Sequence, residues 1–248
     1  MTPCTPTRAT HTNSSKGSSM TTPRQHPLLA PLEGTLVVSC QAYPGEPMRD
    51  PRTMAQVAAA VEIGGASAVR AQGLDDIAAV KAAVKVPVIG IWKDGAEGVF
   101  ITPTLAHAVA VAEAGADIIA LDGTQRPRPD GLTFAETLRR LREVTDAPVM
   151  ADCDSYESAM AAADAGAEII GTTLSGYTGV RPKTDGPDLE LLTQLVAALP
   201  EHVVMAEGRV HTLEHARAAR ATGAFAVVVG TAITHPSSIT SWFRQAVS

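Results

Sequence analysis

Lys93 stands at the end of an apolar run, in VPVIGIWKDG, where a charged side chain requires an explanation. The segment from Val88 to Trp92 has the composition of a strand that is buried on both faces. Removing an ammonium group from water is costly unless neighbouring groups compensate. Lys93 therefore either marks the point where the strand reaches solvent or is a functional group. In the second case it can act as a base with a lowered pKa, or form a Schiff base with a carbonyl substrate.

Other polar residues follow the remaining apolar runs in the same way. Glu207 ends HVVMAE and Asp152 ends APVMAD. The opposite ends of the runs carry Ala, Pro and Gly far more often than charge, so polarity is not a general property of the strand ends. The residues at this position are Gln41, Arg70, Lys93, Asp122, Asp152, Thr172, Thr173, Glu207, Gly230 and Thr231.

A loose internal repeat indicates the elements that must position these residues. Gly-Ala pairs begin at Gly65, Gly115, Gly166 and Gly223, with separations of 50, 51 and 57 residues, and each precedes an apolar run. Glycine is typical just after a helix C-terminus, where φ is positive. Four further apolar runs lie between these repeats. Segments with helical periodicity follow the runs, so strands and helices alternate along the chain.

Eight strands alternating with eight helices predict an α/β fold, a (β/α)8 TIM barrel. An open doubly wound sheet is the alternative. Such a sheet more often has a glycine-rich turn after its first strand, whereas this chain has Val38-Ser39-Cys40-Gln41 there. Barrel active sites lie at the C-terminal ends of the strands. The barrel would therefore collect the polar residues listed above at one rim.

Two glycine-containing segments at that rim suggest a phosphate site. Glu207-Gly208-Arg209 follows the seventh strand, and Gly230-Thr231 follows the eighth. In many barrels these loops bind phosphate through backbone N–H groups, with help from a short helix N-terminus. Glycine lets the backbone approach closely, and Arg209 can add a charged fork. Both glycines could instead serve only tight turns.

Composition excludes several classes of function. The chain of 248 residues has 20 Lys and Arg against 26 Asp and Glu, so nucleic acid and anionic membranes are poor partners. No apolar run approaches the roughly 18 residues of a membrane span. The three cysteines form no CxxC pair, which favours a reducing cytoplasm. Residues 1–28 are rich in Ser, Thr and Pro and predict a disordered tail, and residues 29–248 predict one catalytic domain.

The rim segments resemble the N-acylglucosamine-6-phosphate 2-epimerases, also called N-acetylmannosamine-6-phosphate 2-epimerases, which act in bacterial sialic acid breakdown. The likeness runs in order from about Gly34 to the C-terminus. The segments RAQG and TTLSGYT are its most specific parts. The full set is Ser39–Ala42, Arg70–Gly73, Ile91–Lys93, Ile101–Thr104, Ala120–Asp122, Met150–Asp152, Thr172–Thr178 and Glu207–Arg209.

The resemblance implies interconversion of N-acetylmannosamine 6-phosphate and N-acetylglucosamine 6-phosphate without a cofactor. It also implies that Lys93 and Glu207 carry the catalysis, and that the substrate is contacted by Gln41, Arg70 and Asp152. One departure is His235, in Ala232-Ile233-Thr234-His235-Pro236, where the family usually has an arginine near the phosphate. This replacement puts the strength of phosphate binding in question.

Epimerisation at C2 next to an aldehyde requires a base, a proton donor to the opposite face and groups that stabilise an enolate oxygen. Two assignments are open. In one, neutral Lys93 is the base and Glu207 orients it or holds the exchanged proton. In the other, Glu207 is the base and cationic Lys93 stabilises the enolate.

Three alternative hypotheses on the function are open. The first is an aldolase-type barrel in which Lys93 forms a Schiff base, and the second is a sensor that binds sugar phosphates without catalysis. The third is a zinc site at His211-Thr212-Leu213-Glu214-His215, but a five-residue match occurs easily by chance, so we assign no metal.

The C-terminal segment, Ser238 to Val247, has apolar residues at helical spacing. Members of the family exchange this helix between subunits. The resemblance therefore implies a homodimer, while packing of the helix on its own barrel is the simpler alternative.

Overall fold

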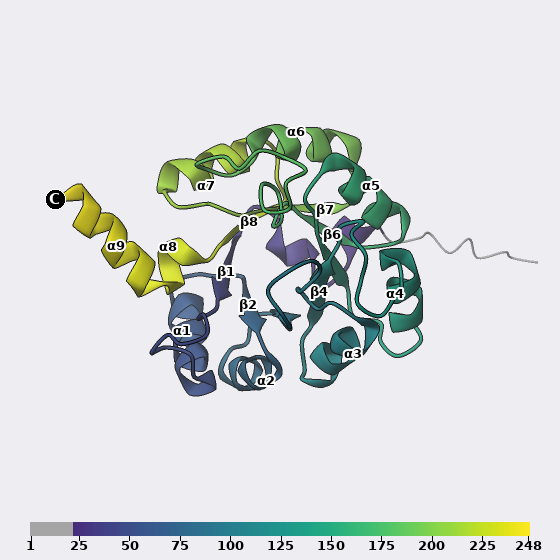
Figure 1. Ribbon diagram of the computed structural model, residues 1–248, viewed down its shortest axis with the longest axis horizontal. Helices are drawn as coiled ribbons and strands as arrows, with labels where there is room; N and C mark the ends of the chain where they lie inside the picture. The colour runs from purple at the N-terminus through teal and green to yellow at the C-terminus, as the bar shows by residue number, and fades with distance from the viewer. Residues whose placement is uncertain (1–21) are drawn as a thin grey trace, which may run out of the picture.

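The computed structural model describes residues 22–248, which form a closed barrel of eight parallel strands (Figure 1). Each strand pairs with its neighbours in sequence, and β1 closes the ring by pairing with β8. The predicted (β/α)8 fold is therefore confirmed. The strands are β1 (Leu36–Cys40), β2 (Ala68–Gln72), β3 (Val88–Ile91), β4 (Ile118–Asp122), β5 (Val149–Asp152), β6 (Ile169–Gly171), β7 (Val203–Glu207) and β8 (Ala226–Val229).

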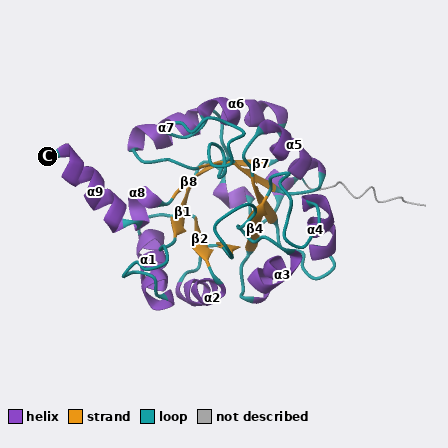
Figure 2. Ribbon diagram, viewed as in Figure 1, coloured by secondary structure: helices purple, strands orange, loops and turns teal. Residues whose placement is uncertain are grey.

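Helices surround the strands as an outer ring (Figure 2). Side chains of Ser, Thr or Asp cap the N-termini of most of them, as expected for residues that accept a hydrogen bond from the first turn. The helices are α1 (Pro51–Ile63), α2 (Leu74–Ala83), α3 (Leu105–Glu113), α4 (Phe134–Leu141), α5 (Tyr156–Asp164), α6 (Leu189–Ala198), α7 (Leu213–Ala221), α8 (Thr231–Thr234) and α9 (Pro236–Ala246).

The Gly-Ala repeat has the structural meaning that its sequence predicts. Gly65, Gly115, Gly166 and Gly223 each lie just beyond a helix, at φ between 94° and 97°. Only glycine adopts this conformation without a steric cost. The repeat therefore marks four equivalent returns from the outer helices to the barrel strands.

The interior of the barrel is filled and closed at its N-terminal end. Side chains such as Ile89, Ile118 and Phe225 fill the inside of the sheet. Leu29 and Leu32, from the 3-10 helical segment η2 (Ala30–Leu32) and the residue before it, are buried against this core. A second 3-10 segment, η1 (Pro23–Gln25), precedes them. Since the strand interior is packed, the space open to a ligand lies at the C-terminal rim.

The predicted tail falls mostly outside the described residues. Residues 1–21 are outside them, and the described part already includes η1 within the predicted tail. No helix within residues 22–248 is both long and apolar enough to cross a membrane.

The C-terminal helix lies apart from the barrel. α8 is a single turn directly after β8, and α9 extends outward from it (Figure 1). None of the residues of α9 is buried. In the described chain, then, the last helix does not pack on the sheet in the way that α1 to α7 do.

Candidate active site

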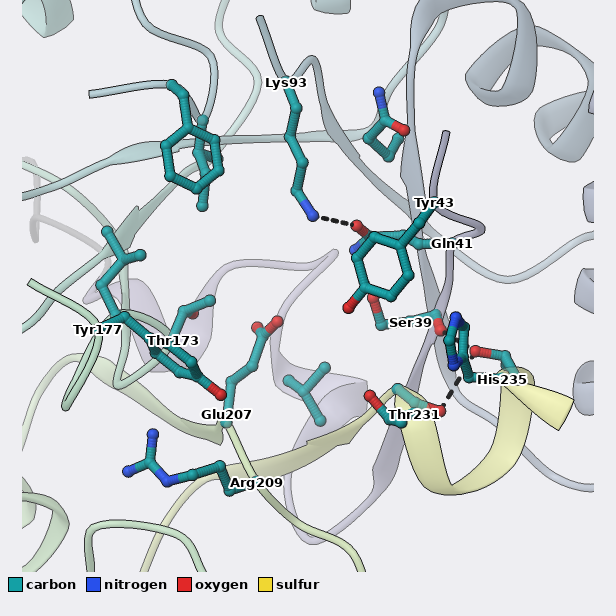
Figure 3. A pocket seen from close by; sticks show the side chains of 18 of the residues that line it. Ser39, Gln41, Tyr43, Lys93, Thr173, Tyr177, Glu207, Arg209, Thr231 and His235 are labelled. Carbon is teal, nitrogen blue, oxygen red and sulfur yellow. Dashed lines mark hydrogen bonds between the residues drawn. The ribbon is translucent and has the colours of Figure 1, made fainter. Parts of the chain in front are cut away.

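Lys93 and Glu207 face the same cavity from opposite sides of the barrel. Glu207 is the last residue of β7, and Lys93 lies two residues beyond β3, paired with Ile101 in an isolated antiparallel bridge. β3 and β7 are separated by three strands in either direction around the ring. Figure 3 shows the two side chains pointing toward each other across the cavity. The cavity has a volume of about 650 Å³ and opens at the C-terminal rim.

Lys93 is poised to lose its proton near neutral pH. Burial lowers the pKa of its ammonium to about 8, and the charge of Arg70 acts in the same direction. Its Nζ donates a hydrogen bond to Oε1 of Gln41 at 2.7 Å. Gln41 is held in turn because its Nε2 donates to Oγ of Ser39 at 2.6 Å. The amide therefore fixes the direction of Lys93 without neutralising its charge.

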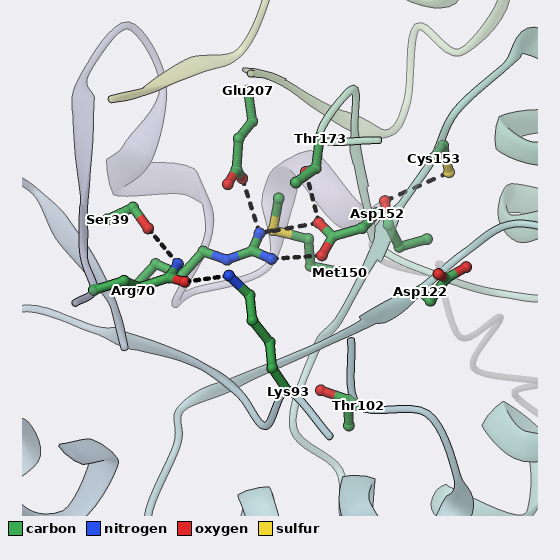
Figure 4. A network of polar contacts seen from close by, with 12 residues as sticks. Ser39, Arg70, Lys93, Thr102, Asp122, Met150, Asp152, Cys153, Thr173 and Glu207 are labelled. Atoms are coloured by element: carbon green, nitrogen blue, oxygen red, sulfur yellow. Dashed lines mark hydrogen bonds and ion pairs between the residues drawn. The ribbon is translucent and has the colours of Figure 1, made fainter. Parts of the chain in front are cut away.

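Arg70 lies beneath the cavity floor and connects two carboxylates (Figure 4). Its Nη1 and Nη2 donate to the two oxygens of Asp152 at 2.9 and 2.5 Å, and Nη1 also donates to Glu207 at 2.8 Å. The side chain of Arg70 is only 1% exposed, and that of Asp152 is fully buried. Burial disfavours the charged form of Arg70, but the charges of Asp152 and Glu207 outweigh this effect and raise its pKa.

Glu207 is the carboxylate of this network that reaches the cavity. Burial raises the pKa of Glu207 to about 7, although the positive charge of Arg70 opposes the shift. Hydrogen bonds between Thr172 and the backbone of Glu207 fix the end of β7, at 2.9 Å to its oxygen and 3.1 Å to its nitrogen. Thr173 donates to Asp152 at 2.7 Å. Lys93 and Glu207 can thus both change protonation state between about pH 7 and 8.

The glycine-containing loops after β7 and β8 form the wall of the cavity next to Glu207. Gly208 has φ of +106°, a conformation that favours glycine, and Gly230 precedes the first turn of α8. The N–H groups of the first residues of a helix, here Thr231 and Ala232, have no acceptor within the helix. Gly208, Gly230 and Thr231 all line the cavity.

Arg209 lines the cavity, but its guanidinium is committed to neighbouring loops. It donates to the backbone oxygens of Gly186 at 3.0 Å and Ser175 at 2.6 Å, and to Oγ1 of Thr184 at 3.0 Å. All three acceptors are neutral. Arg209 therefore connects the loops around the cavity through neutral acceptors, which leave its positive charge unneutralised there.

His235 connects the loop after β1 to the first turn of α9 at the rim. Its Nε2 lies 2.7 Å from an oxygen of Glu46, in the loop after β1, and its Nδ1 lies 2.7 Å from Oγ of Ser238 in α9. The ring also packs edge-on against Tyr43, with ring centroids 4.9 Å apart. His235 lines the cavity, so the residue that replaces the expected arginine stands beside the glycine loops.

The geometry agrees with what the chain resembles among known proteins. A family model described as "Putative N-acetylmannosamine-6-phosphate epimerase" matches residues 54–248. The chain belongs to this family. A Cutibacterium acnes protein is 63% identical over 221 residues, covering 89% of this chain and 96% of its own. A Caldanaerobacter subterraneus protein is 48% identical over 222 residues, covering 88% and 93%. Both are named "Putative N-acetylmannosamine-6-phosphate 2-epimerase".

A solved structure shares the architecture of this epimerase family member. It is described as the N-acetylmannosamine-6-phosphate 2-epimerase from Clostridium perfringens, and it is 36% identical with a TM-score of 0.85. The match covers 89% of this chain and 96% of that one.

The structure divides the predicted site residues of this epimerase family member into two layers. The upper layer lines the cavity and consists of Gln41, Lys93, Glu207, Gly208, Arg209, Gly230, Thr231 and His235. Arg70 and Asp152 form the lower layer, beneath Glu207. The predicted place of Arg70 at a strand end is wrong, because β2 continues for two more residues to Gln72. Asp122, another rim residue, is fully buried and bonded to Thr124 and Arg126, away from Lys93 and Glu207.

Several cavity residues were not among the predicted site residues. Tyr43 and Arg49 come from the loop after β1, and Phe100 comes from the loop after β3. These three residues lie in loops rather than at strand ends, so a search restricted to strand ends does not find them. Tyr177, from the TTLSGYT segment of the family resemblance, also lines the cavity and is 53% exposed.

The two histidines of the zinc-like motif have other contacts. His211 precedes α7 and lies against Trp242, with ring centroids 4.9 Å apart, and His215 accepts a hydrogen bond from the backbone of His211. Within residues 22–248, no group of three or more His, Cys, Asp or Glu side chains is arranged to hold a metal ion.

Proposed function

We propose that this protein interconverts N-acetylmannosamine 6-phosphate and N-acetylglucosamine 6-phosphate by exchanging the proton at C2. The proposal rests on one observation above all: Lys93 and Glu207 face one cavity from opposite walls, and burial brings both of their pKa values close to neutrality. Membership of the epimerase family and the relatives' names support the choice of substrate.

The opposed walls suit inversion at a single carbon. In the open-chain sugar the C2–H bond lies next to the C1 aldehyde, so its removal gives an enolate. Neutral Lys93 takes the proton on one face, and the C–H electron pair forms the C1–C2 double bond. Protonated Glu207 then gives its proton to C2 on the other face. The reverse reaction begins with ionised Glu207 and cationic Lys93, so each residue is the base for one epimer.

Arg70 and Asp152 act through Glu207 in this proposal. The guanidinium holds Glu207 by a direct bond, and Asp152 fixes the guanidinium with both of its oxygens. Gln41 plays the corresponding role for Lys93. A cavity with preset donors stabilises a developing enolate oxygen better than water does, because little solvent has to reorganise.

The phosphate is assigned to the loops after β7 and β8. Gly208, Gly230 and Thr231 offer backbone N–H groups, and Arg209 adds positive charge nearby. His235 stands beside these loops and holds the rim through Glu46 and Ser238. Helix N-termini and glycine turns of this kind favour anions. These loops and Lys93 line the same cavity, so one sugar phosphate can contact both.

Solvent isotope exchange tests the proposed function directly. N-acetylmannosamine 6-phosphate is incubated with the protein in D₂O, and C2 is followed by NMR. We expect conversion to the gluco epimer with deuterium at C2, and loss of both signals in Lys93→Ala while its fold is retained. Absence of conversion by the wild-type protein contradicts the proposal. Borohydride trapping of a substrate adduct on Lys93 would favour an aldolase-type Schiff base instead.

We also infer the setting of the reaction. The family resemblance supports a place in sialic acid breakdown. Cys40 and Cys153 are buried free thiols, which supports a reducing cytoplasm. The lack of buried residues in α9 supports a homodimer, because an amphipathic helix with exposed Phe243 gains stability against a partner surface.

A further inference from the structure

The catalytic lysine stands on a short hairpin rather than on a barrel strand. Beyond β3 the chain continues to Lys93, turns, and returns antiparallel through Ile101. The backbone N–H of Asp94 donates to the oxygen of Phe100 at 3.0 Å, which closes the turn. The direction of Lys93 therefore depends on how the returning strand is anchored.

Thr102 anchors the hairpin through both backbone groups of Trp92, the residue before Lys93. The N–H of Thr102 donates to the oxygen of Trp92 at 2.8 Å, and Oγ1 of Thr102 accepts from the N–H of Trp92 at 3.1 Å. The hydroxyl of Thr102 thus accepts the hydrogen bond that a backbone carbonyl would accept in a regular antiparallel pair of strands. Thr102 is fully buried, and Figure 4 shows it near the base of the Lys93 side chain.

The backbone of Thr102 is held in an uncommon conformation. Its φ is +45°, a value that is a genuine outlier for a β-branched residue. Pro103 follows it and further restricts the backbone that Thr102 can adopt. Such conformations persist only where the surroundings impose them, and they gather at functional sites.

The end of β4 and the loop that follows it hold Thr102 in this conformation. Arg128, which is 5% exposed, donates to the oxygens of Thr102 at 3.2 Å and Asp122 at 2.7 Å. The N–H of Asp122 donates to the oxygen of Ile101 at 3.0 Å. Arg128 and the end of β4 therefore bind the returning segment, Ile101 and Thr102, through the backbone oxygens that do not face Trp92.

We propose that Thr102, held by a hydrogen bond from Arg128, is a positioning residue that directs the side chain of Lys93 into the cavity. This inference rests on the proposed function of Lys93, but it concerns the geometry of the lysine and not the identity of the substrate. Thr102 is fully buried and is not among the residues that line the cavity, so it does not contact a substrate bound there.

Three substitutions separate the hydroxyl from the fold. Thr102→Ser keeps the acceptor, Thr102→Val removes it at nearly constant shape, and Thr102→Gly removes it while relieving the positive φ. We expect Thr102→Val and Thr102→Gly to lose about 10- to 100-fold in kcat with KM little changed, because small misplacements of a reacting group have effects of this size. Thr102→Ser should stay within a few-fold of the wild type.

A second readout is independent of catalysis. Competitive labelling of lysines with acetic anhydride, followed by mass spectrometry across pH, reports the pKa of Lys93 in the ligand-free protein. In Thr102→Gly we expect this pKa to rise, since a loosened lysine gains water. The readout holds even if the substrate is another sugar, so failure of the proposed function and failure of this inference give different results.

Thr137→Val is the matched control. Thr137 is also fully buried and donates one hydroxyl hydrogen bond, at 2.9 Å to Thr133, but it lies in α4 away from the cavity. Its substitution should leave kcat and Lys93 labelling unchanged. The inference is overturned if Thr102→Gly matches the wild type in both readouts, if Thr102→Val loses no more activity than Thr137→Val, or if Thr102→Ser is as impaired as Thr102→Gly.

Discussion

Lys93 and Glu207 approach one cavity from opposite sides, because the strands that lead to them, β3 and β7, are as far apart as two strands of this barrel can be. A sugar carbon between them presents one face to each group. Inversion at that carbon then needs no rotation of the intermediate. The arrangement also makes the two residues a coupled pair, since each lies in the electrostatic field of the other.

The pair predicts a bell-shaped pH profile. Both directions of the proposed reaction start with one proton shared by the pair, on Glu207 in one case and on Lys93 in the other. With pKa values of about 7 for Glu207 and about 8 for Lys93, this form appears as pH rises through 7 and is lost above 8. We expect kcat/KM, measured from pH 5.5 to 10, to be greatest between these values. A plateau that continues to pH 10 contradicts a role for protonated Lys93.

Substitution of Glu207 separates exchange from epimerisation. In Glu207→Gln the carboxyl can no longer give or take a proton, while Lys93 still serves its own face of the sugar. We expect net epimerisation to fall by at least about 100-fold, in the range typical of loss of general acid–base catalysis. The epimer whose C2–H faces Lys93 should still exchange with D₂O without inverting.

The matching variant of the other wall is Lys93→Arg, which keeps a positive charge but cannot act as a base at neutral pH. It should lose exchange on the Lys93 face and retain slow exchange on the Glu207 face. If Lys93→Arg epimerises at a rate close to that of the wild type, the lysine serves only as a cation, and Glu207 is the sole base.

The fold and the meeting of Lys93 and Glu207 in one cavity could be predicted because both have local signals. Glycines at positive φ mark the helix ends at Gly65, Gly115, Gly166 and Gly223, and a charged residue after a buried run marks Lys93 and Glu207. Parallel strands in a closed barrel then bring all strand ends to one rim. This step requires only topology.

The layering of the site could not be predicted, because it depends on where each strand ends. The sequence pattern places both Arg70 and Glu207 at strand ends, but β2 continues to Gln72, so Arg70 is buried within its strand while Glu207 ends β7 and lines the cavity. Arg209 likewise satisfies neutral acceptors of the β6–α6 loop, whose position no periodicity encodes. The contributions of Tyr43 and Arg49 depend on loop conformation for the same reason.

Removal of Arg70 should destabilise the protein severely. Arg70→Met leaves the carboxylate of Asp152 fully buried, with Thr173 as a remaining donor. Breaking a buried pair from one side typically costs about 3–5 kcal/mol in free energy of unfolding. Urea unfolding at pH 7 measures the change. Arg139→Met removes the exposed pair with Glu143 and should cost less than about 1 kcal/mol. Equal losses in the two variants would show that Arg70 is not a charged anchor.

His235 should affect affinity for the phosphate more than the chemical step. In His235→Ala the rim beside Gly230 and Thr231 loses the contact of the ring with the carboxylate of Glu46, which holds the loop after β1 in place. A hydrogen bond to a charged group contributes roughly 1.5–3 kcal/mol, so we expect KM for N-acetylmannosamine 6-phosphate to rise by about 10-fold or more while kcat changes less. Unphosphorylated N-acetylmannosamine is the control, and its slow turnover should be the same in both proteins. An equal loss with both sugars would place His235 near the ring and not near the phosphate.

The exposed face of α9 should hold two subunits together. Phe243 is 70% exposed although it lies on a helix that also carries Ile239 and Trp242. A charge at this position would oppose burial of the helix against another chain, so Phe243→Glu should convert a dimer to a monomer of 25.7 kDa in light scattering. Leu213→Glu changes an equally exposed residue on α7 and should leave the dimer intact.

The same variant tests whether assembly orders the cavity rim. His235 contacts both Glu46, in the loop after β1, and Ser238, in α9, so a monomer that also binds substrate weakly would indicate that it does. A wild-type protein that is already monomeric at micromolar concentration would instead mean that α9 has another partner surface.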